Sequence, residues 1–237
     1  YDYFPWMQVR LGQFKEPFSL EQLTADKNLA LNERSMAWYL TPDRDVGFMV
    51  HGTLLNEALV YGVGMFNGDG RDADRRSQRD DKQVTGRLAV RPFNSFGPEF
   101  LKTLQIGGSF SYSRLDTSDF EFNVKTPART TFFTLQPRGK FYLLEDIDDL
   151  NRWGGEIAYA IGPVVLTGEY IRNKFKDVKI AETDRFDFSM RAWYAQMLIM
   201  LTGERPALHG GVLEKIRPLK DFNMRTGGWG AWGLAFM

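Results

Sequence analysis

The sequence predicts an all-β fold, and within that class a transmembrane antiparallel β-barrel. Apolar residues alternate with small or polar ones through many segments, which is the period of a strand. The polar members are mostly Gly, Ser, Thr and Gln with isolated charges, which suits a wall that lines water better than the surface of a soluble strand. No apolar run reaches the roughly 18 residues of a spanning helix, whereas Ala192–Leu201 has the length of a spanning strand.

Composition narrows the classes of function. Lys plus Arg and Asp plus Glu number 30 each, so the formal net charge is zero, whereas a general nucleic-acid binder carries a basic excess. The chain has no cysteine, which excludes a disulfide, a thiolate metal site and a covalently attached c-type haem within it. Its two histidines, His51 and His209, argue against a multi-histidine metal site. We therefore expect no cofactor and no nucleic-acid partner.

Nine segments show the strand pattern, and many have one apolar face. The expected strands are Trp6–Phe14, Val46–Thr53, Leu59–Asn67, Val84–Pro92, Leu104–Leu115, Thr130–Gln136, Arg152–Ile161, Val164–Arg172 and Phe186–Thr202. The outward, lipid-facing set is expected to include Leu88, Val90, Ile106, Phe110, Ile157 and Tyr159. Tryptophans in or beside strands suit the aromatic belts of a membrane wall, and these are Trp6, Trp38, Trp153, Trp193, Trp229 and Trp232.

The connectors are charged and rich in Gly and Asp. The most polar, Asn67–Lys82, is interpreted as a solvated loop, with an ion-attracting pore mouth as the alternative. Its Asp-Gly pattern lacks the downstream bidentate Glu of an EF-hand, so we do not expect it to bind calcium. Asp26–Leu40 has mixed periodicity and is flanked by Pro17 and Pro42, which predicts a short helix or irregular segment against the inner wall.

Two architectures remain open on pattern alone. A soluble β-sandwich packs two apolar faces together, whereas a membrane barrel turns its apolar face outward and its polar face inward. The small, polar composition of the second face favours the barrel, because closure also removes the strand edges that a bilayer cannot satisfy.

Five segments follow one another along the chain in a recognisable order. They are Val9–Glu21 (VRLGQFKEPFSLE), Asn32–Leu40 (NERSMAWYL), Phe66–Gly70 (FNGDG), Arg152–Tyr170 (RWGGEIAYAIGPVVLTGEY) and Ala192–Pro206 (AWYAQMLIMLTGERP). Together they resemble the phosphate-selective porin O/P family of Gram-negative outer membranes. The resemblance implies a sixteen-stranded barrel, usually a homotrimer, that passes small anions by diffusion and is bordered by membrane lipid or lipopolysaccharide.

The whole chain, residues 1–237, is expected to form a single barrel domain. Sixteen strands with their turns and loops need more residues than this. The sequence is expected to start after the first strands, and Gly227–Met237 resembles an interior strand rather than a terminal one. We therefore expect N-terminal and C-terminal strands of the barrel to be missing from it.

A pore needs a narrow, hydrated path with charges of the right sign, and no nucleophile or acid–base pair. Lys and Arg favour anions, and the planar fork of Arg matches phosphate. Strand parity directs four arginines inward, one lysine lies at the Lys15-Glu16-Pro17 break, and two further cations lie in the segment NVKTPART. The predicted anion-binding, pore-lining residues are thus Arg10, Lys15, Arg87, Arg91, Lys125, Arg129 and Arg152. The alternative for each is a structural salt bridge inside the lumen, for instance with Glu156 or Glu169.

The resemblance also bears on selectivity. Phosphate-selective members of the family carry a dense row of arginines in the region that corresponds to Glu121–Thr131. This chain has only Lys125 and Arg129 there. We therefore expect an anion-preferring or general pore in which phosphate is favoured only slightly.

Three other functions compete with a porin. One is a structural sleeve that holds a partner such as a multihaem cytochrome, in which case the haem belongs to the partner. Another is a barrel enzyme such as a lipase or protease, but the chain has no GxSxG elbow and few histidines for a catalytic pair. The third is a soluble β-sandwich binding module.

Overall fold

The computed structural model describes residues 3–68, 82–115, 122–126, 130–135, 144–180, 184–225 and 227–237. Strands dominate these residues, and the helical elements are short. The helical elements are α1 (Leu20–Leu23), η1 (Asp26–Asn28), η2 (Met36–Leu40) and η4 (Glu99–Leu101). The strands are β1 (Gln8–Lys15), β2 (Arg44–Leu54), β3 (Leu59–Phe66), β4 (Gln83–Val90), β5 (Gln105–Arg114), β6 (Phe122–Lys125), β7 (Thr131–Leu135), β8 (Leu144–Asp146), β9 (Asp149–Ile161), β10 (Val164–Ile180), β11 (Phe186–Met200), β12 (Leu208–His209), β13 (Val212–Leu213) and β14 (Gly233–Phe236).

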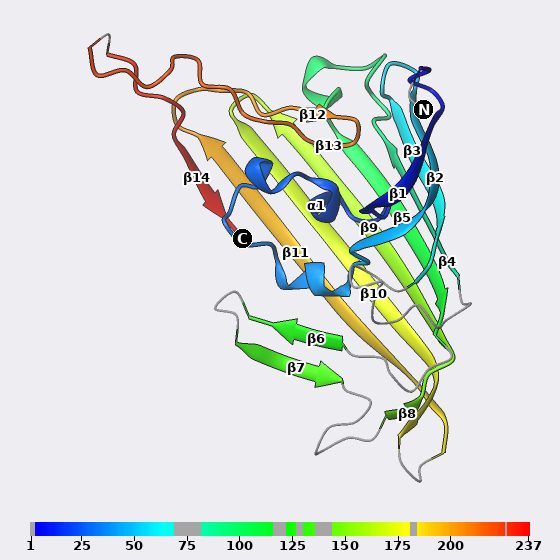
Figure 1. Ribbon diagram of the computed structural model, residues 1–237. Coiled ribbons are helices and arrows are strands. Elements are labelled where there is room, and N and C mark those ends of the chain that lie inside the picture. Colours follow the sequence, from blue (N-terminus) through cyan, green and yellow to red (C-terminus); the bar gives the residue numbers. More distant parts are fainter. Residues whose placement is uncertain are drawn as a thin grey trace.

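One antiparallel sheet of ten strands organises the molecule (Figure 1). Its path is β1-β2-β3-β4-β5-β9-β10-β11-β14, and β8 pairs with the far end of β10. The sheet is open, with β1 and β14 at the two ends of the path. Two hairpins, β6–β7 and β12–β13, form separate small sheets. The predicted all-β fold is confirmed.

The long strands β10 and β11 depart from their predicted bounds. We expected the first to end at Arg172, but β10 continues to Ile180, with an irregular register between Phe175 and Val178. Asp177 has a positive φ of 52° there, a conformation that breaks the regular alternation on which the prediction relied. β11 ends at Met200 rather than Thr202 because a turn follows.

The C-terminal segment also differs from the expected long strand. Within Gly227–Met237, the strand is β14 (Gly233–Phe236), which pairs with the end of β11, while Gly228 forms an isolated bridge to Asn223.

The two faces of the sheet differ in chemistry. On the outer face, Leu88, Ile106 and Ile157 are exposed, and they belong to the set that we expected to face outward. Leu11, 75% exposed, and Phe48 are opposite each other on β1 and β2 and extend this apolar face. The strand parity that placed apolar residues on one side is therefore preserved across the sheet.

The inner face of β9–β11 is covered by the segment of residues 16–43, which we call the inward segment (Figure 1). Phe18, Ala37 and Leu40 of this segment form a buried cluster with Ile171 and Tyr194 of the wall. Leu20 joins a second cluster, which includes Leu208 and Leu213 of the β12–β13 hairpin as well as wall residues of β9, β10 and β11. The inward segment and the hairpin thus form an inner layer that packs on the wall.

The predicted helical or irregular conformation of Asp26–Leu40 is confirmed, because η1 and η2 lie within it. Trp38 corrects the expected belt of six tryptophans. It lies in η2 and donates its indole N–H to the side chain of Gln22, so it belongs to the inner layer. Trp153 and Trp193, by contrast, are exposed on the outer face.

No helix among the described residues combines the length and apolarity that a membrane-spanning helix requires. Residues 69–81 of the polar connector lie outside the described residues. The structure therefore does not test whether this connector is a solvated loop or a pore mouth.

Candidate functional site

A basic cavity of about 380 Å³ lies on the inner side of β1–β4. The wall residues that line it come from β1, β2, β3 and β4, while the inward segment and the β12–β13 hairpin complete the lining. The cationic side chains among them are Arg10, Lys15, Arg44 and Arg87, and His51 lies beside them. None of the described residues in the lining is acidic.

Arg10 reaches this cavity because β1 alternates. Its neighbour across the sheet is Met49, which is buried, whereas Leu11 faces the other way and is exposed. The guanidinium lies over the ring of Phe14 at 5.6 Å from the centroid, and Phe14 in turn packs edge-on against Phe66 at 5.5 Å. Among the described residues, Arg10 forms no ion pair, so its charge is available to solutes.

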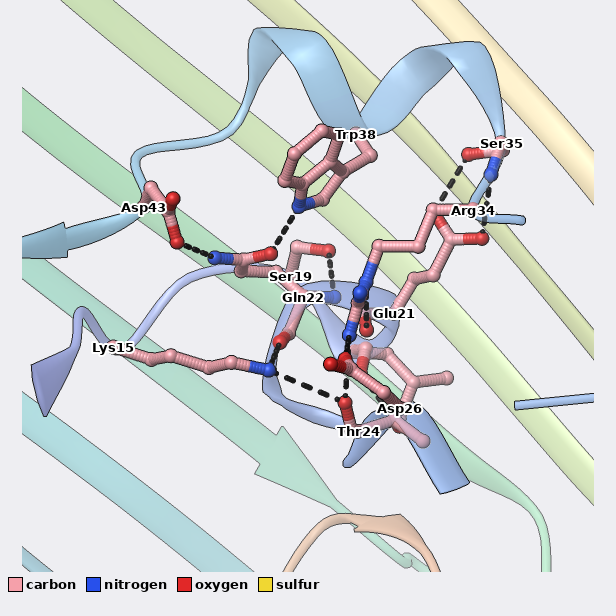
Figure 2. Close-up of polar contacts among 11 residues, drawn as sticks. Lys15, Ser19, Glu21, Gln22, Thr24, Asp26, Arg34, Ser35, Trp38 and Asp43 are labelled. Atoms are coloured by element: carbon pink, nitrogen blue, oxygen red, sulfur yellow. Dashed lines mark hydrogen bonds and ion pairs between the residues drawn. The ribbon is translucent and has the colours of Figure 1, made fainter. Parts of the chain in front are cut away.

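Lys15 lies where the wall ends and the inward segment begins (Figure 2). Its Nζ donates to the backbone oxygen of Gln22 at 2.6 Å and to that of Thr24 at 3.4 Å. Both carbonyls belong to the turn of α1 and its end, where helix carbonyls lack partners within the helix. Lys15 therefore holds the inward segment and also lines the cavity.

Glu21 and Arg34 close the inward segment on itself (Figure 2). Glu21 accepts from the backbone N–H and the hydroxyl of Ser35, at 2.8 and 2.7 Å. Burial raises the pKa of the Glu21 carboxyl, and the hydrogen bonds from Ser35 oppose this. Arg34 donates to Asp26 at 2.6 Å and to the Thr24 carbonyl at 3.0 Å, and its hydrogen bond lowers the pKa of Asp26.

Gln22 connects three parts of the inward segment. Its backbone N–H donates to Ser19 Oγ at 3.1 Å, which caps α1, and its amide donates to Asp43 at 3.0 Å. Its amide oxygen accepts from Trp38. Figure 2 shows these contacts converging on Gln22 from η2 and from the approach to β2.

Glu169 of β10 fastens the inward segment to the wall. Its two carboxylate oxygens accept from the backbone N–H groups of Leu20 and Glu21, at 3.0 and 2.7 Å, and from the Tyr194 hydroxyl at 2.8 Å. All four residues are buried. A carboxylate that satisfies backbone donors in this way fixes the position of the chain above it.

Glu16 begins the inward segment and is buried beneath it. One of its oxygens accepts hydrogen bonds from the side chains of Gln83 and Thr85 on β4. Burial raises the pKa of Glu16 to about 7, although the hydrogen bonds and the positive charge of Arg152 act in the opposite direction.

Arg152 projects from β9 toward the inner side, as strand parity predicted. Its Nη1 lies 3.3 Å from the Gln83 amide oxygen and 3.5 Å from Ser111 Oγ. Its buried Nε has no hydrogen-bond partner within the described part of the chain. The side chain does not line the basic cavity.

Arg87 lines the cavity but is fully engaged. It donates to both oxygens of Glu156, at 2.8 and 2.6 Å, and to the carbonyl of Gly211 at 2.7 Å. The ion pair is buried, and Gln105 also donates to the Gly211 carbonyl at 3.1 Å. Arg87 thus shows the alternative considered for these cations, a lumenal salt bridge with Glu156, and it holds the β12–β13 hairpin over the wall.

Arg91 follows β4 and anchors the same hairpin. It donates to the Glu57 backbone oxygen and forms an ion pair with the Glu57 carboxylate at 2.9 Å. The other carboxylate oxygen of Glu57 lies 2.8 Å from His209. The structure therefore places Arg91 at the base of the hairpin and outside the lining of the basic cavity.

The remaining two predicted residues lie away from this site. Lys125 ends β6, in the β6–β7 hairpin, and Arg129 lies outside the described residues. The structure thus brings together Arg10, Lys15 and Arg87 at the cavity.

Two lining residues, Arg44 and His51, were absent from the predicted set. His51 shares the parity of Met49 on β2, and this signal is present in the sequence. Arg44 pairs with Lys15 at the end of the strand, and our predicted strand began two residues later at Val46. Among the described residues, Arg44 is exposed and forms no ion pair.

Comparisons with known proteins identify the family of this chain. The family model "Phosphate-selective porin O and P" matches residues 1–237. Porin O of Pseudomonas aeruginosa is 26% identical over 258 residues, an alignment that covers 97% of this chain and 54% of that protein. The chain therefore spans about half the length of this curated relative. With its sheet of antiparallel strands and its match along the whole sequence, the chain belongs to the phosphate-selective porin O and P family, whose members are β-barrel proteins of the bacterial outer membrane.

Proposed function

We propose that this chain forms part of the wall and the constriction of a passive pore that favours small anions. The observation that supports this proposal best is the inner cavity lined by Arg10, Lys15 and Arg44 without an acidic residue in its described lining. Fixed positive charge between low-dielectric walls raises the local concentration of anions.

The wall and the inner layer have different roles in the proposed pore. Buried acids hold the inner layer, because Glu169 binds the start of α1 and Glu156 binds Arg87. The inner layer packs on β9–β11, and the basic cavity lies along β1–β4. Anions therefore pass beside the inward segment, along the side of the wall that carries the unpaired arginines.

The proposed selectivity is modest. Arg10 and Arg44 are exposed, so an anion exchanges part of its hydration for a guanidinium and leaves again easily. Two guanidinium forks suit phosphate as well as chloride. We propose passive diffusion by a homotrimer, with no catalytic step and only a slight preference for phosphate.

The sleeve around a multihaem partner is the less favoured function. A sleeve requires an inner face that is free to contact another chain. Here, the inner face of β9–β11 is covered by residues 16–43 of the same chain, through buried clusters that include Phe18 and Leu40.

Reversal potentials across a salt gradient test the proposal on the intact protein in planar bilayers. Wild type should prefer anions, and the double variant Arg10→Gln, Arg44→Gln should lose most of that preference. The matched control is Arg172→Gln, Arg191→Gln, which removes the same charge from the outer face and should leave the reversal potential unchanged. Cation preference in wild type, or equal reversal potentials in the two double variants, would contradict the proposal.

A further inference from the structure

Two arginines lie next to each other on the outer face of the wall. Arg172 of β10 and Arg191 of β11 are direct cross-strand neighbours, and Trp153 of β9 is the neighbour of Arg172 on its other side. Arg191 is exposed and Arg172 is half-buried. Neither forms an ion pair within the described part of the chain.

This pair needs an anion. Like charges directly opposite each other on a sheet are destabilising, and a guanidinium in contact with hydrocarbon costs several kcal/mol. In addition, the buried Nε of Arg172 has no hydrogen-bond partner among the described residues. Lys174, two residues along the same face, is by contrast neutralised by Asp187 at 2.7 Å. Among the described residues, the wall therefore supplies an acid for Lys174 and none for the arginine pair.

The surroundings are those of a membrane interface. Trp153, Tyr170 and Trp193 are exposed on the same face, and Trp193 is 74% exposed. Tyr170 and Trp193 are cross-strand neighbours and form the next pair on the same face, two residues along the strands from Arg172 and Arg191. Aromatic girdles mark the level of the lipid headgroups in outer-membrane barrels.

Trp153 and Arg191 lie nearer the start of β9 and of β11, and Arg172 lies at the middle of β10. Beyond Arg172, β10 continues through Lys174 and Lys176 to the end where the connectors 67–82 and 115–143 are long. At the opposite end, β2–β3 and β9–β10 are joined by the tight turns 55–58 and 162–163, whereas β4–β5 and β11–β14 are joined by the longer stretches 91–104 and 201–232. Long loops are extracellular in such barrels. Because the connections 16–43, 67–82 and 115–143 lie at the first end and both tight turns lie at the other, we assign the first end to the side of the outer leaflet.

We propose that Arg172 and Arg191 form a binding site for a phosphate group of the outer-leaflet lipid, which in this membrane is lipopolysaccharide. One phosphate accepts hydrogen bonds from the accessible nitrogens of both guanidinium groups, which offsets their mutual repulsion. The aromatic side chains contact the adjoining sugar and acyl chains. This site faces the lipid and is independent of the proposed conduction through the lumen.

Binding of defined lipids tests the site. The intact protein is purified in detergent, and native mass spectrometry measures binding of bisphosphorylated lipid A, of dephosphorylated lipid A with the same acyl chains, and of phosphatidylglycerol. Wild type should bind the bisphosphorylated lipid about tenfold more tightly than the dephosphorylated one, the ratio that corresponds to about one charge-assisted hydrogen-bonding group. Stronger binding of phosphatidylglycerol than of lipid A would overturn the assignment to the outer leaflet.

The variant arm identifies the residues. Arg172→Gln, Arg191→Gln should lose the preference for phosphorylated lipid A, and Arg172→Lys, Arg191→Lys should recover part of it. The control is Arg205→Gln, Arg217→Gln, two exposed arginines between β11 and β14 that should keep wild-type binding. Unchanged lipid binding by the Gln double variant would overturn the proposal. Dissociation of this variant into monomers with lipid binding intact would also overturn it, because Arg172 and Arg191 would then join two copies of the chain. If the Gln variant does not fold, the comparison of the two lipids on wild type and the Lys variant still decides.

Discussion

Acidic side chains on the inner side of the wall hold backbone and arginine groups in place, and most of them are buried. Glu156 pairs with Arg87, and Glu169 accepts from two backbone N–H groups of the inward segment. Among the cations that line the basic cavity, Arg87 is paired and Lys15 is hydrogen-bonded to backbone carbonyls, which leaves Arg10 and Arg44 without an ion pair among the described residues. We therefore expect anion selectivity to depend on which cations lack an acidic partner, and not on the number of cations alone.

Glu16 should make stability depend on pH. Its pKa rises from 4.5 to about 7 on burial, so between these values the folded state binds more protons than the unfolded state. The free energy of unfolding should then decrease as pH rises through this window, by at most about 3 kcal/mol. Asp45 adds to the upward shift, and Arg152 opposes it. Glu16→Gln should flatten the dependence of the urea midpoint on pH; a slope as steep as that of wild type would assign the effect to other groups.

The Arg87–Glu156 pair should be costly to break from one side. Arg87→Met leaves a buried carboxylate without its partner, which should lower the free energy of unfolding by about 3–5 kcal/mol. The double variant Arg87→Met, Glu156→Leu should recover much of that loss. Urea titrations of the folded barrel measure both; additive losses in the double variant would argue against a coupled pair.

The sequence predicted the direction in which several arginine side chains point, but it did not determine which acidic partner each arginine binds. Parity alone placed Arg10 and Arg87 on the inner side, because successive side chains in a strand point to opposite faces. The sequence indicated Glu156 as a candidate salt-bridge partner but could not tell which arginine Glu156 binds, since the contact joins strands that are far apart in the sequence. Arg44 was missed because our predicted strand began at Val46, and because Arg44 shares the strand parity of the exposed residues Val46 and Phe48, so alternation does not place it in the lining.

At the scale of elements, the inward segment was predictable in character but not in detail. The break at Lys15-Glu16-Pro17 and the mixed periodicity of Asp26–Leu40 indicated that the chain leaves the wall. Its anchors, such as the hydrogen bond from Asn173 of β10 to the Leu40 carbonyl at 3.0 Å, depend on tertiary packing. Trp38 was assigned to the outer belt for the same reason, because composition does not reveal which layer a residue joins.

Arg34 should control the order of the inward segment. Arg34→Met removes its hydrogen bonds to Asp26 and to the carbonyls of Thr24 and Glu21, worth about 1–3 kcal/mol together. Hydrogen exchange should accelerate in residues 16–43 and remain unchanged in β9–β11. Lys27→Met, an exposed neighbour, serves as the control. Equal exchange in the two variants would show that the apolar clusters alone order the segment.

The outer face of β5 should not tolerate charge. Ile106 is exposed there and is opposite Val90 and Ile157 on the neighbouring strands. Ile106→Arg places a guanidinium against lipid and should reduce stability in bilayers by about 2–4 kcal/mol. Ile106→Leu should be nearly neutral. Wild-type stability of the arginine variant would mean that this face does not contact hydrocarbon.

At the scale of the whole molecule, we propose that the sheet and its inner layer form one side of a water-filled passage. The described sheet ends at β1 and β14 without closing, and the chain spans about half of a curated relative. We propose that strands outside this sequence close the wall into the sixteen-stranded barrel that the family resemblance implies. The single-domain organisation of residues 1–237 remains a prediction on the same basis.

Accessibility to a charged reagent tests the central claim most directly. The chain has no cysteine, so single cysteines can be introduced at Arg10 and at Leu11, adjacent positions on opposite faces of β1. A water-soluble, negatively charged methanethiosulfonate is then added to single channels of the intact protein, with wild type as the control. We predict that Arg10→Cys reacts with a stepwise fall in current and that Leu11→Cys, buried in lipid, does not respond. A current block in Leu11→Cys with none in Arg10→Cys would contradict the inward orientation of Arg10 and, with it, the basic cavity as the path of the anions.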